Sequence, residues 1–333
     1  MRRVFFINPV AGQKDSSDRL IPQIRQAASE LGLPEPEIVI TQHAGHAREM
    51  AEQLASGSEP IELYACGGDG TLNELVQGAA GHPNAAVGCV PCGSGNDYVR
   101  NFGKDGSQAF LDMTEQLKAA PECVDLLDTS LGLGIDICAA GLDAQVAYGI
   151  PKFRRLPGCG GTMAYTLSIV EALFSKFGHR LRVTVDGESH IGTYMMTAIC
   201  NGRLYGGGYM AAPFAAMDDG LLDMVLVKPI PRIKIAGFLA KYRAGEHMLQ
   251  DGVVSETFRP YLSFCRAKSV EIEVLDGRPI IATVDGECQP VMNLSVKTKP
   301  AALTVLLPQS AINSAGAIKG AYPLPEPVRA GLQ

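Results

Sequence analysis

The sequence predicts an α/β plus β fold, in which a three-layer α/β domain is followed by an antiparallel β-sandwich domain. Three observations lead to this prediction. The chain has 333 residues, enough for two domains. Apolar runs alternate with helical patterns as far as residue 125, which is typical of a parallel sheet covered by helices. Beyond that point, short β-rich runs dominate, with Asp-Gly turns between them.

Composition narrows the class of protein. Hydrophobic residues make up 46% of the chain and the net charge is −6, so large cores are expected and nucleic acid is not an expected partner. No window reaches about 18 apolar residues, which argues against a transmembrane helix. The first residues have too short an apolar run for a signal peptide. The nine cysteines show one C-x-x-C pair without a second pair for zinc, so we expect a reduced, cytoplasmic protein.

The elements of the first domain, residues 1–125, follow in order. Strands are expected at residues 4–7, 37–41, 61–66 and 85–91, and helices at residues 18–31, 46–54, 71–80, 98–102 and 107–119. The first helix shows apolar residues at helical spacing, such as Leu20, Ile24 and Leu31. Ligands of such sheets bind beyond the carboxyl ends of the strands, so the loops at those ends form the candidate site.

The second domain, residues 126–299, is expected to be mostly β-structure. Strands are expected at residues 135–140, 181–185, 191–200, 224–227, 270–274, 280–284 and 294–298, and helices at about residues 161–177 and 232–242. Asp186-Gly187 and Asp276-Gly277 are predicted to be hairpin turns, because Asp-Gly favours the tight turns that join antiparallel strands.

The most informative stretch is IELYACGGDGTLNE, residues 61–74, where a strand passes into a helix. Gly67, Gly68 and Gly70 let the backbone approach an anion and tolerate a positive φ. The first amides of the following helix have no partner within it and face the positive end of its dipole. The stretch therefore predicts a phosphate cradle. It is neither a P-loop nor a G-x-G-x-x-G fingerprint, and an ordinary packing turn is the structural alternative.

A second polar loop, PCGSGND at residues 91–97, also follows a strand and precedes a helical stretch. Asn96 or Asp97 could simply cap that helix. Together, however, the two segments resemble the diacylglycerol kinase catalytic domain family, which includes bacterial lipid kinases and sphingosine kinases. CGGDGTLNE resembles the nucleotide-binding signature of that family, and the second loop matches its P-x-G-[ST]-x-N-D pattern. NAD kinases and phosphofructokinases share only the GGDG core, and their nucleotide-binding domains are of the same type.

The resemblance implies a site for ATP and Mg²⁺ at the rim of the first sheet. The residues that it implies for nucleotide binding are Asn8, Pro9, Gly12, Thr41, Gly67, Gly68, Asp69, Gly70, Thr71, Asn73, Glu74, Ser94 and Asn96. Mg²⁺ between the phosphates would be held, directly or through waters, by Asp69, Asp97 and Asp125. The family also closes its first domain with the last strand of the chain, here within about residues 300–333.

The sequence TVDGE occurs twice, at residues 184–188 and 283–287. The first copy is consistent with a plain hairpin turn. The second lies where the family has its catalytic D-G-E, so the resemblance implies that Glu287 is the general base and Asp285 its acidic neighbour.

Residues 201–223 resemble the segment that carries a structural magnesium site in the family. The ligands implied are the carboxylate of Asp219 and main-chain oxygens of Ala216 and Leu221, which suit the oxygen coordination of Mg²⁺. The alternative is that Asp218-Asp219-Gly220 is only a turn.

The resemblance implies an ATP- and Mg²⁺-dependent lipid kinase acting on a lipid hydroxyl, with diacylglycerol the first choice. Phosphatidylglycerol, sphingoid bases and ceramide are other acceptors, and an NAD kinase-like enzyme or a non-catalytic lipid-binding relic are the alternatives. The expected partners are the lipid and a membrane surface that the protein contacts peripherally; a homodimer is left open. Residues 151–157 are predicted to be a basic membrane-contact loop, with residues 232–243 as second choice. A solvated basic loop is equally compatible with the sequence.

Overall fold

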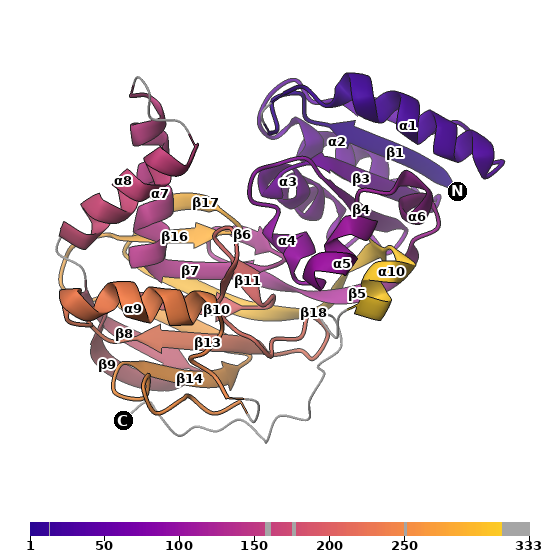
Figure 1. Cartoon of the computed structure of the whole chain (residues 1–333). Helices are drawn as coiled ribbons and strands as arrows, with labels where there is room; N and C mark the ends of the chain where they lie inside the picture. The colour runs from indigo at the N-terminus through magenta and orange to yellow at the C-terminus, as the bar shows by residue number, and fades with distance from the viewer. Residues whose placement is uncertain (13, 157–160, 175–177, 250–251, 315–333) are drawn as a thin grey trace.

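The computed structural model describes residues 1–12, 14–156, 161–174, 178–249 and 252–314. It has an α/β part built from the first 120 or so residues and a β-rich part built from most of the rest (Figure 1). The predicted fold class is confirmed in both parts.

The N-terminal part is a parallel sheet with helices on both faces. Its strands are β1 (Arg2–Ile7), β2 (Glu37–Ile40), β3 (Ile61–Gly67) and β4 (Ala85–Pro91), arranged in the order β2-β1-β3-β4. Its helices are α1 (Ser17–Glu30), α2 (His46–Ala55), α3 (Asp69–Ala79), α4 (Asp97–Arg100), α5 (Gly103–Ala109) and α6 (Met113–Leu117). Helices α1 and α6 bury one face of the sheet, and α2 and α3 bury the other. The carboxyl ends of the strands therefore meet at one rim, where the candidate loops begin.

The C-terminal part is an antiparallel sandwich. Strands β15 (Ser269–Val274), β8 (His179–Val185) and β9 (Glu188–Tyr194) extend one sheet, and the facing sheet has the order β14 (Leu262–Ala267), β13 (Leu222–Val227), β10 (Met196–Cys200), β7 (Ile137–Gly141), β16 (Ile280–Val284), β17 (Glu287–Val291). A buried apolar core lies between the two sheets, with Val183 and Val270 from one and Met224 and Ala282 from the other. Helices α7 (Leu142–Arg154), α8 (Gly161–Phe174) and α9 (Arg232–Arg243) lie outside the second sheet, as Figure 1 shows.

One long strand, β18 (Asn293–Leu307), joins the two parts. Its first half pairs antiparallel with β15, and its second half pairs parallel with β4, Thr304 opposite Ala86. Ala301 has a φ of +46° between the two halves, where the pairing with β5 (Ala120–Thr129) shifts register. Because β18 lies in the middle of a 10-stranded sheet that runs through both parts, the domain limits at residues 125 and 299 stay a prediction. The remaining described elements are three short strands, β6 (Gly132–Gly134), β11 (Leu204–Tyr205) and β12 (Tyr209–Met210), and helix α10 (Gln309–Ser314).

The helix predicted at residues 107–119 is wrong, because the chain forms two shorter helices there. Helix α5 ends at Ala109 and α6 begins at Met113. The carboxylate of Asp112 accepts hydrogen bonds from the amides of Thr114 and Glu115, 2.8 and 3.1 Å long. Such a side-chain cap starts a new helix instead of continuing the previous one.

Two predictions in the sandwich are also wrong. The strand expected at residues 191–200 is interrupted at Met195, where the chain leaves β9 in one sheet and enters β10 in the other. Asp276-Gly277 joins β15 to β16, which lie in opposite sheets, so it is not a hairpin turn. The hairpin lies one strand later, at Asp285-Gly286 between β16 and β17.

The basic segment at residues 151–157 is not the predicted loop, because α7 continues through Pro151 to Arg154; residue 157 lies outside the described residues. Lys152 forms an ion pair with Glu171 of α8. No helix within the described ranges is long and apolar enough to cross a membrane.

Candidate active site

The glycine turn between β3 and α3 packs directly on the loop that follows β4. The carbonyl oxygen of Gly67 accepts hydrogen bonds from the amides of Cys92 and Gly93, 2.7 and 3.2 Å long. A Cβ on Gly93 would lie only 2.5 Å from the Cα of Gly68, so the backbones could not approach this closely with larger residues. Neither Gly68 nor the other two glycines of the turn have a positive φ. The glycines are therefore needed for close approach and not for a left-handed conformation.

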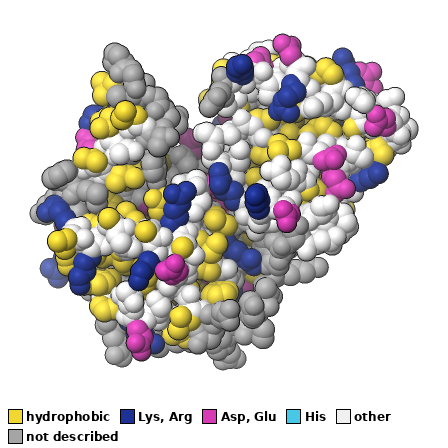
Figure 2. All heavy atoms as spheres, viewed as in Figure 1, with side chains coloured by type: hydrophobic (Ala, Val, Ile, Leu, Met, Phe, Trp, Pro, Cys, Tyr) yellow, Lys and Arg dark blue, Asp and Glu magenta, His cyan; other side chains and the backbone are white. Residues whose placement is uncertain are grey.

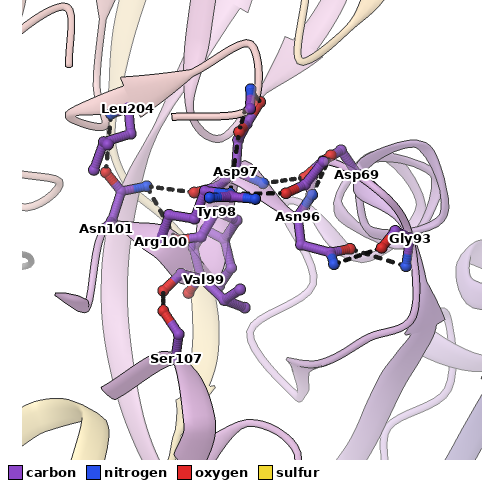
Figure 3. A network of polar contacts seen from close by, with 12 residues as sticks. Asp69, Gly93, Asn96, Asp97, Tyr98, Val99, Arg100, Asn101, Ser107 and Leu204 are labelled. Atoms are coloured by element: carbon purple, nitrogen blue, oxygen red, sulfur yellow. Dashed lines mark hydrogen bonds and ion pairs between the residues drawn. The ribbon is translucent and has the colours of Figure 1, made fainter. Parts of the chain in front are cut away.

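Asp69 connects the two glycine-rich loops. Its carboxylate accepts hydrogen bonds from the amides of Asn96 and Asp97, 2.8 and 2.7 Å long (Figure 3). Asn96 has a φ of +53°, and its side-chain amide closes the loop through Gly93. Burial raises the pKa of Asp69 despite these hydrogen bonds. Asp69 thus holds the second loop in place through two of its backbone amides.

Asp97 lies at the start of α4 and faces the β11–β12 segment. Its carboxylate accepts a hydrogen bond of 2.9 Å from the amide of Gly207 and lies 3.7 Å from the Nε of Arg100. Burial, and then the nearby charge of Asp69, raise the pKa of Asp97 to about 6. Asp97 therefore changes charge close to neutral pH.

Asp285 is held in place by four hydrogen-bond donors. The amides of residues 135, 136 and 137 donate to its carboxylate at 2.7 to 3.0 Å, and the side chain of Asn73 donates at 3.2 Å. Asp285 has a φ of +46° at the hairpin turn, a conformation that a non-glycine residue adopts at some cost. Burial raises the pKa of Asp285 in spite of these donors. The residue fixes the β16–β17 turn against α3 through Asn73.

This anchoring brings Glu287 to the glycine turn. Glu287 is exposed at the start of β17, and its Oε1 would lie 3.5 Å from a Cβ built on Gly70. The two residues are far apart in the sequence, yet the carboxylate lies beside the first turn of α3. Its counterpart in the first TVDGE copy, Glu188, lies on the β8–β9 hairpin at the edge of the other sheet.

A cavity of 460 Å³ extends from these acids into the helices of the sandwich part. Asp69, Asp97, Asp136 and Asp285 line one end of it. The other end is lined mainly by apolar side chains of the helices and of β10: Leu142, Val146, Ala147, Ile150, Ile169, Met196 and Leu239. No Lys, Arg or His is among the described residues that line it. The cavity can therefore hold an apolar chain with a polar end facing the acids.

The sequence prediction missed two acids of this cavity. Asp136 is 5% exposed, and its Oδ1 accepts a hydrogen bond of 2.9 Å from the side chain of Asn101. Asp143, at the start of α7, accepts a hydrogen bond of 2.8 Å from the hydroxyl of Tyr205, and burial raises its pKa to about 6. Burial also raises the pKa of Asp136. Single aspartates within apolar runs were the only signal in the sequence.

The loop after β1 also reaches the site. The side-chain amide of Asn8 donates to the hydroxyl of Thr71, 3.0 Å away, and so touches the first turn of α3; Pro9 follows in the same loop. Gly12 has a φ of +81°, and a Cβ there would collide with the carbonyl oxygen of Cys92. Ser94 lines the cavity. The structure thus brings together most of the residues that the sequence indicated.

Three predicted residues have other contacts. The amide of Thr41 donates to the carbonyl oxygen of Ile7, which ends the pairing of β1 and β2. The carboxylate of Glu74 accepts hydrogen bonds from the amides of Gly45 and Ala47, 2.7 and 3.1 Å long, at the start of α2. Asp125 is 2% exposed and does not line the cavity. Its carboxylate accepts hydrogen bonds from the amides of Gly220 and Ala301, and so it lies apart from Asp69 and Asp97.

At the predicted structural magnesium site, the carboxylate of Asp219 is paired with the guanidinium group of Arg266. The Oδ2 of Asp219 lies 2.7 Å from an Nη2 of Arg266, whose Nε lies 2.8 Å from Asp223. The other oxygen of Asp219 accepts a hydrogen bond from the amide of Leu221. Among the described residues, no three His, Cys, Asp or Glu side chains are grouped as a metal site. Asp219 is thus held by Arg266 and by the amide of Leu221, and the magnesium ligand set of Ala216, Asp219 and Leu221 stays a prediction.

Comparisons with known proteins cover both parts of the chain. The diacylglycerol kinase catalytic domain family matches residues 2–128, and the YegS C-terminal NAD kinase beta sandwich-like domain matches residues 136–307. A Pseudomonas aeruginosa protein named "Probable lipid kinase YegS-like" is 30% identical over 290 residues, 85% of this chain and 87% of the relative. "Diacylglycerol kinase" of Staphylococcus carnosus is 27% identical over 289 residues, 84% of this chain and 86% of the relative. The crystal structure of a diacylglycerol kinase from Bacillus anthracis matches with a TM-score of 0.68 at 19% identity, over 93% of this chain and 98% of that one, which shows a shared fold.

Proposed function

Since the chain belongs to the diacylglycerol kinase catalytic domain family of lipid kinases, we propose that it transfers the γ-phosphoryl group of MgATP to a lipid hydroxyl, with diacylglycerol as the acceptor. The observation that supports this most is the position of Glu287. Its carboxylate lies beside Gly70 at the first turn of α3, near the acid end of a cavity whose other end is apolar. In this proposal the phosphates, the proton acceptor and the acyl chain occupy adjacent parts of the site.

In the proposed reaction, the phosphates of MgATP lie against the first amides of α3, where the helix dipole favours negative charge. Asp97 and Asp136, at the end of the cavity, would favour the positive charge of a magnesium ion bound with the nucleotide, and that ion would neutralise part of the charge on the phosphates. Glu287 accepts the proton of the lipid hydroxyl while the new P–O bond forms and the bond to the oxygen of ADP breaks. Asp285 keeps the Glu287 turn in place.

The chemistry of the cavity favours diacylglycerol over the other acceptors. The described lining has no cationic side chain, so the phosphodiester of phosphatidylglycerol would lie against carboxylates without compensation. NAD carries a pyrophosphate, which would lie against the carboxylates of a described lining that has no cationic side chain. A long-chain amino alcohol would bring a positive charge to the acids and is the acceptor to compare with diacylglycerol. We propose that the reaction takes place at the cytoplasmic surface of a membrane, where such lipids reside.

The experiment is transfer of labelled phosphate from ATP to dispersed lipids. Separate reactions contain diacylglycerol, a long-chain amino alcohol, phosphatidylglycerol, NAD or no acceptor, each with and without Mg²⁺. We expect labelled product with diacylglycerol and Mg²⁺ only. Labelling of the amino alcohol alone would change the proposed acceptor but keep the reaction class, and labelling of NAD alone would overturn the lipid-kinase proposal. Absence of any lipid product with intact ATP binding would favour a non-catalytic lipid-binding protein.

A further inference from the structure

The three helices that enclose the apolar end of the cavity also expose large apolar side chains to solvent. On α7 and just beyond its end, Tyr148 and Leu156 are 50% and 49% exposed, and on α8, Met163 is 54% exposed. Ile233, in the first turn of α9, is 92% exposed. Exposed apolar residues are common when scattered singly, but several on adjacent helices indicate an interaction surface.

Helices α7 and α8 form a hairpin with two apolar sides. On the inner side, Val146 and Ile150 of α7 and Ile169 of α8 line the cavity. The hydroxyl of Ser168 donates to the carbonyl oxygen of Val146, which ties the two helices together. Figure 1 shows the hairpin standing out from the sandwich. The outer side, with Tyr148 and Met163, has no described protein element packed over it that would explain its apolar character.

The charge of α9 adds a second property to this surface. Its sequence, RIKIAGFLAKYR, has four cationic residues and no acidic one, although the whole chain has a net charge of −6. Arg232 and Lys234 are exposed and flank Ile233. Over α9, Lys and Arg side chains alternate with hydrophobic ones (Figure 2). Positive charge around protruding apolar side chains is complementary to an anionic lipid surface.

We infer that these helices dock the protein on an anionic bilayer, through a docking face that consists of Tyr148, Leu156, Met163 and Ile233 with Arg155, Arg232 and Lys234. The inference rests on the proposed function, because the same helices enclose the cavity that would take the lipid chain. An acyl chain can then pass from the leaflet to the cavity between α7, α8 and α9 without crossing water. The face keeps Arg155 and Leu156 of the segment predicted at residues 151–157, where Lys152 is paired with Glu171, and adds Ile233, Arg232 and Lys234 of α9. Lys234 also lies over the ring of Tyr261.

The test is sedimentation of the full-length protein with vesicles of equal parts phosphatidylglycerol and phosphatidylcholine at low salt. The variant Leu156→Ser, Met163→Ser, Ile233→Ser removes three exposed apolar groups, so folding should be unaffected. We expect the partition coefficient to fall about 1000-fold, since each of the three side chains contributes about a factor of ten when it is buried in the bilayer. The matched control is Ile40→Ser, Leu111→Ser, Ile191→Ser, which removes three exposed apolar groups elsewhere and should bind as the wild type does.

A second variant, Arg232→Glu with Lys234→Glu, should also lose binding, and only on vesicles that contain the anionic lipid. Equal loss in the control triple, or unchanged binding of both docking-face variants, would overturn the inference. Activity on a water-soluble, short-chain diacylglycerol separates this result from the proposed function. We expect the docking-face variants to retain that activity. A wild type that binds vesicles but phosphorylates no lipid would contradict the proposed function and leave the docking face standing.

Discussion

Asp285 and Glu287 are two residues apart and have opposite surroundings. Four donors surround the carboxylate of Asp285, so it has little capacity left for a substrate. Glu287 is exposed beside Gly70. The first TVDGE copy also has a hydrogen-bonded aspartate followed by an exposed glutamate. Its Asp186 has a positive φ and accepts hydrogen bonds from the amides of Lys268 and Ser269, and Glu188 is exposed. The repeated sequence is thus a repeated turn, and its second copy is the one that brings a glutamate beside Gly70.

Glu287→Gln should keep the shape of the site and remove the proton acceptor. We expect kcat to fall about 100-fold or more while the Kd of ATP changes little. Steady-state kinetics and nucleotide binding on the same preparation measure the two effects. Glu188→Gln is the matched control, because it changes the same residue of the other turn, and it should keep its activity. If the two variants behave alike, Glu287 is not the base.

Gly70→Ala tests the space between α3 and Glu287. The φ of Gly70 is not positive, and its Cβ would make only an ordinary 3.5 Å contact, so the variant should fold with a normal melting temperature. The methyl group would nevertheless occupy the approach of a phosphate to the first amides of α3. We expect the Kd of ATP to rise about tenfold, measured by titration calorimetry. An unchanged Kd would place the phosphates elsewhere.

At the scale of elements, the segment before β13 is held by a guanidinium. Arg266 of β14 bridges Asp219 and Asp223, and its side chain is only 14% exposed. Burial raises the pKa of Asp223 to about 6, against the opposite effect of Arg266. Removing one member of such a buried network leaves charges without a partner, which costs more than the network contributes.

Arg266→Met should therefore lower stability by about 3 kcal/mol, as seen in denaturant titrations. Arg25→Met is the control, because the Arg25–Glu35 pair is 57% and 68% exposed and should contribute less than about 1 kcal/mol. Chelation of divalent ions should leave the stability of the wild type unchanged if Arg266 is the cation of this segment. A clear loss on chelation would instead restore the magnesium site at Asp219.

The elements differ in how far the sequence could predict them. The parallel sheet was predictable, because each strand and helix has its own apolar pattern and the rim follows from strand direction. The crossing at Met195 was not, since passage between sheets leaves no signal in residue type. Helix α7 was missed because Pro151 suggested a loop. Asp125 lies within β5, and the sequence does not reveal which way its carboxylate faces, so its absence from the described lining of the cavity could not be predicted. Asp136 has no motif around it.

Over the whole molecule, buried carboxyl groups couple the fold to pH. Burial raises the pKa values of Asp97, Asp143 and Asp223 to about 6, whereas an aspartate in the unfolded chain titrates near 4. Between these values the folded state binds more protons than the unfolded state. The contribution of these groups to the free energy of unfolding therefore increases as the pH falls from about 6 to about 4, and decreases as it rises.

Asp97→Asn removes one of these carboxyl groups. The amide oxygen of the substituted side chain can still accept the hydrogen bond from the amide of Gly207. We expect the melting temperature to rise by about 3 °C at pH 7.5, where the wild-type carboxylate is buried and charged, and to change little at pH 4. Calorimetric scans at pH 4, 6 and 7.5 measure this. A shift of equal size at all three pH values would show that the effect is one of packing and not of charge.

The double membership of β18 has a consequence for synthesis on the ribosome. The parallel sheet receives its last strand from residues near Thr304 and Val305, so β4 has no neighbour on that side until almost the whole chain has been translated. Most domains fold as soon as their own residues have emerged, and this sheet has to wait for the sandwich to be made first. During that interval β4 presents an open edge of the kind that pairs with other chains. Ribosomes that stall after residue 125 would therefore release fragments prone to aggregate, while the nascent full-length chain would depend on chaperones until its final strand arrives.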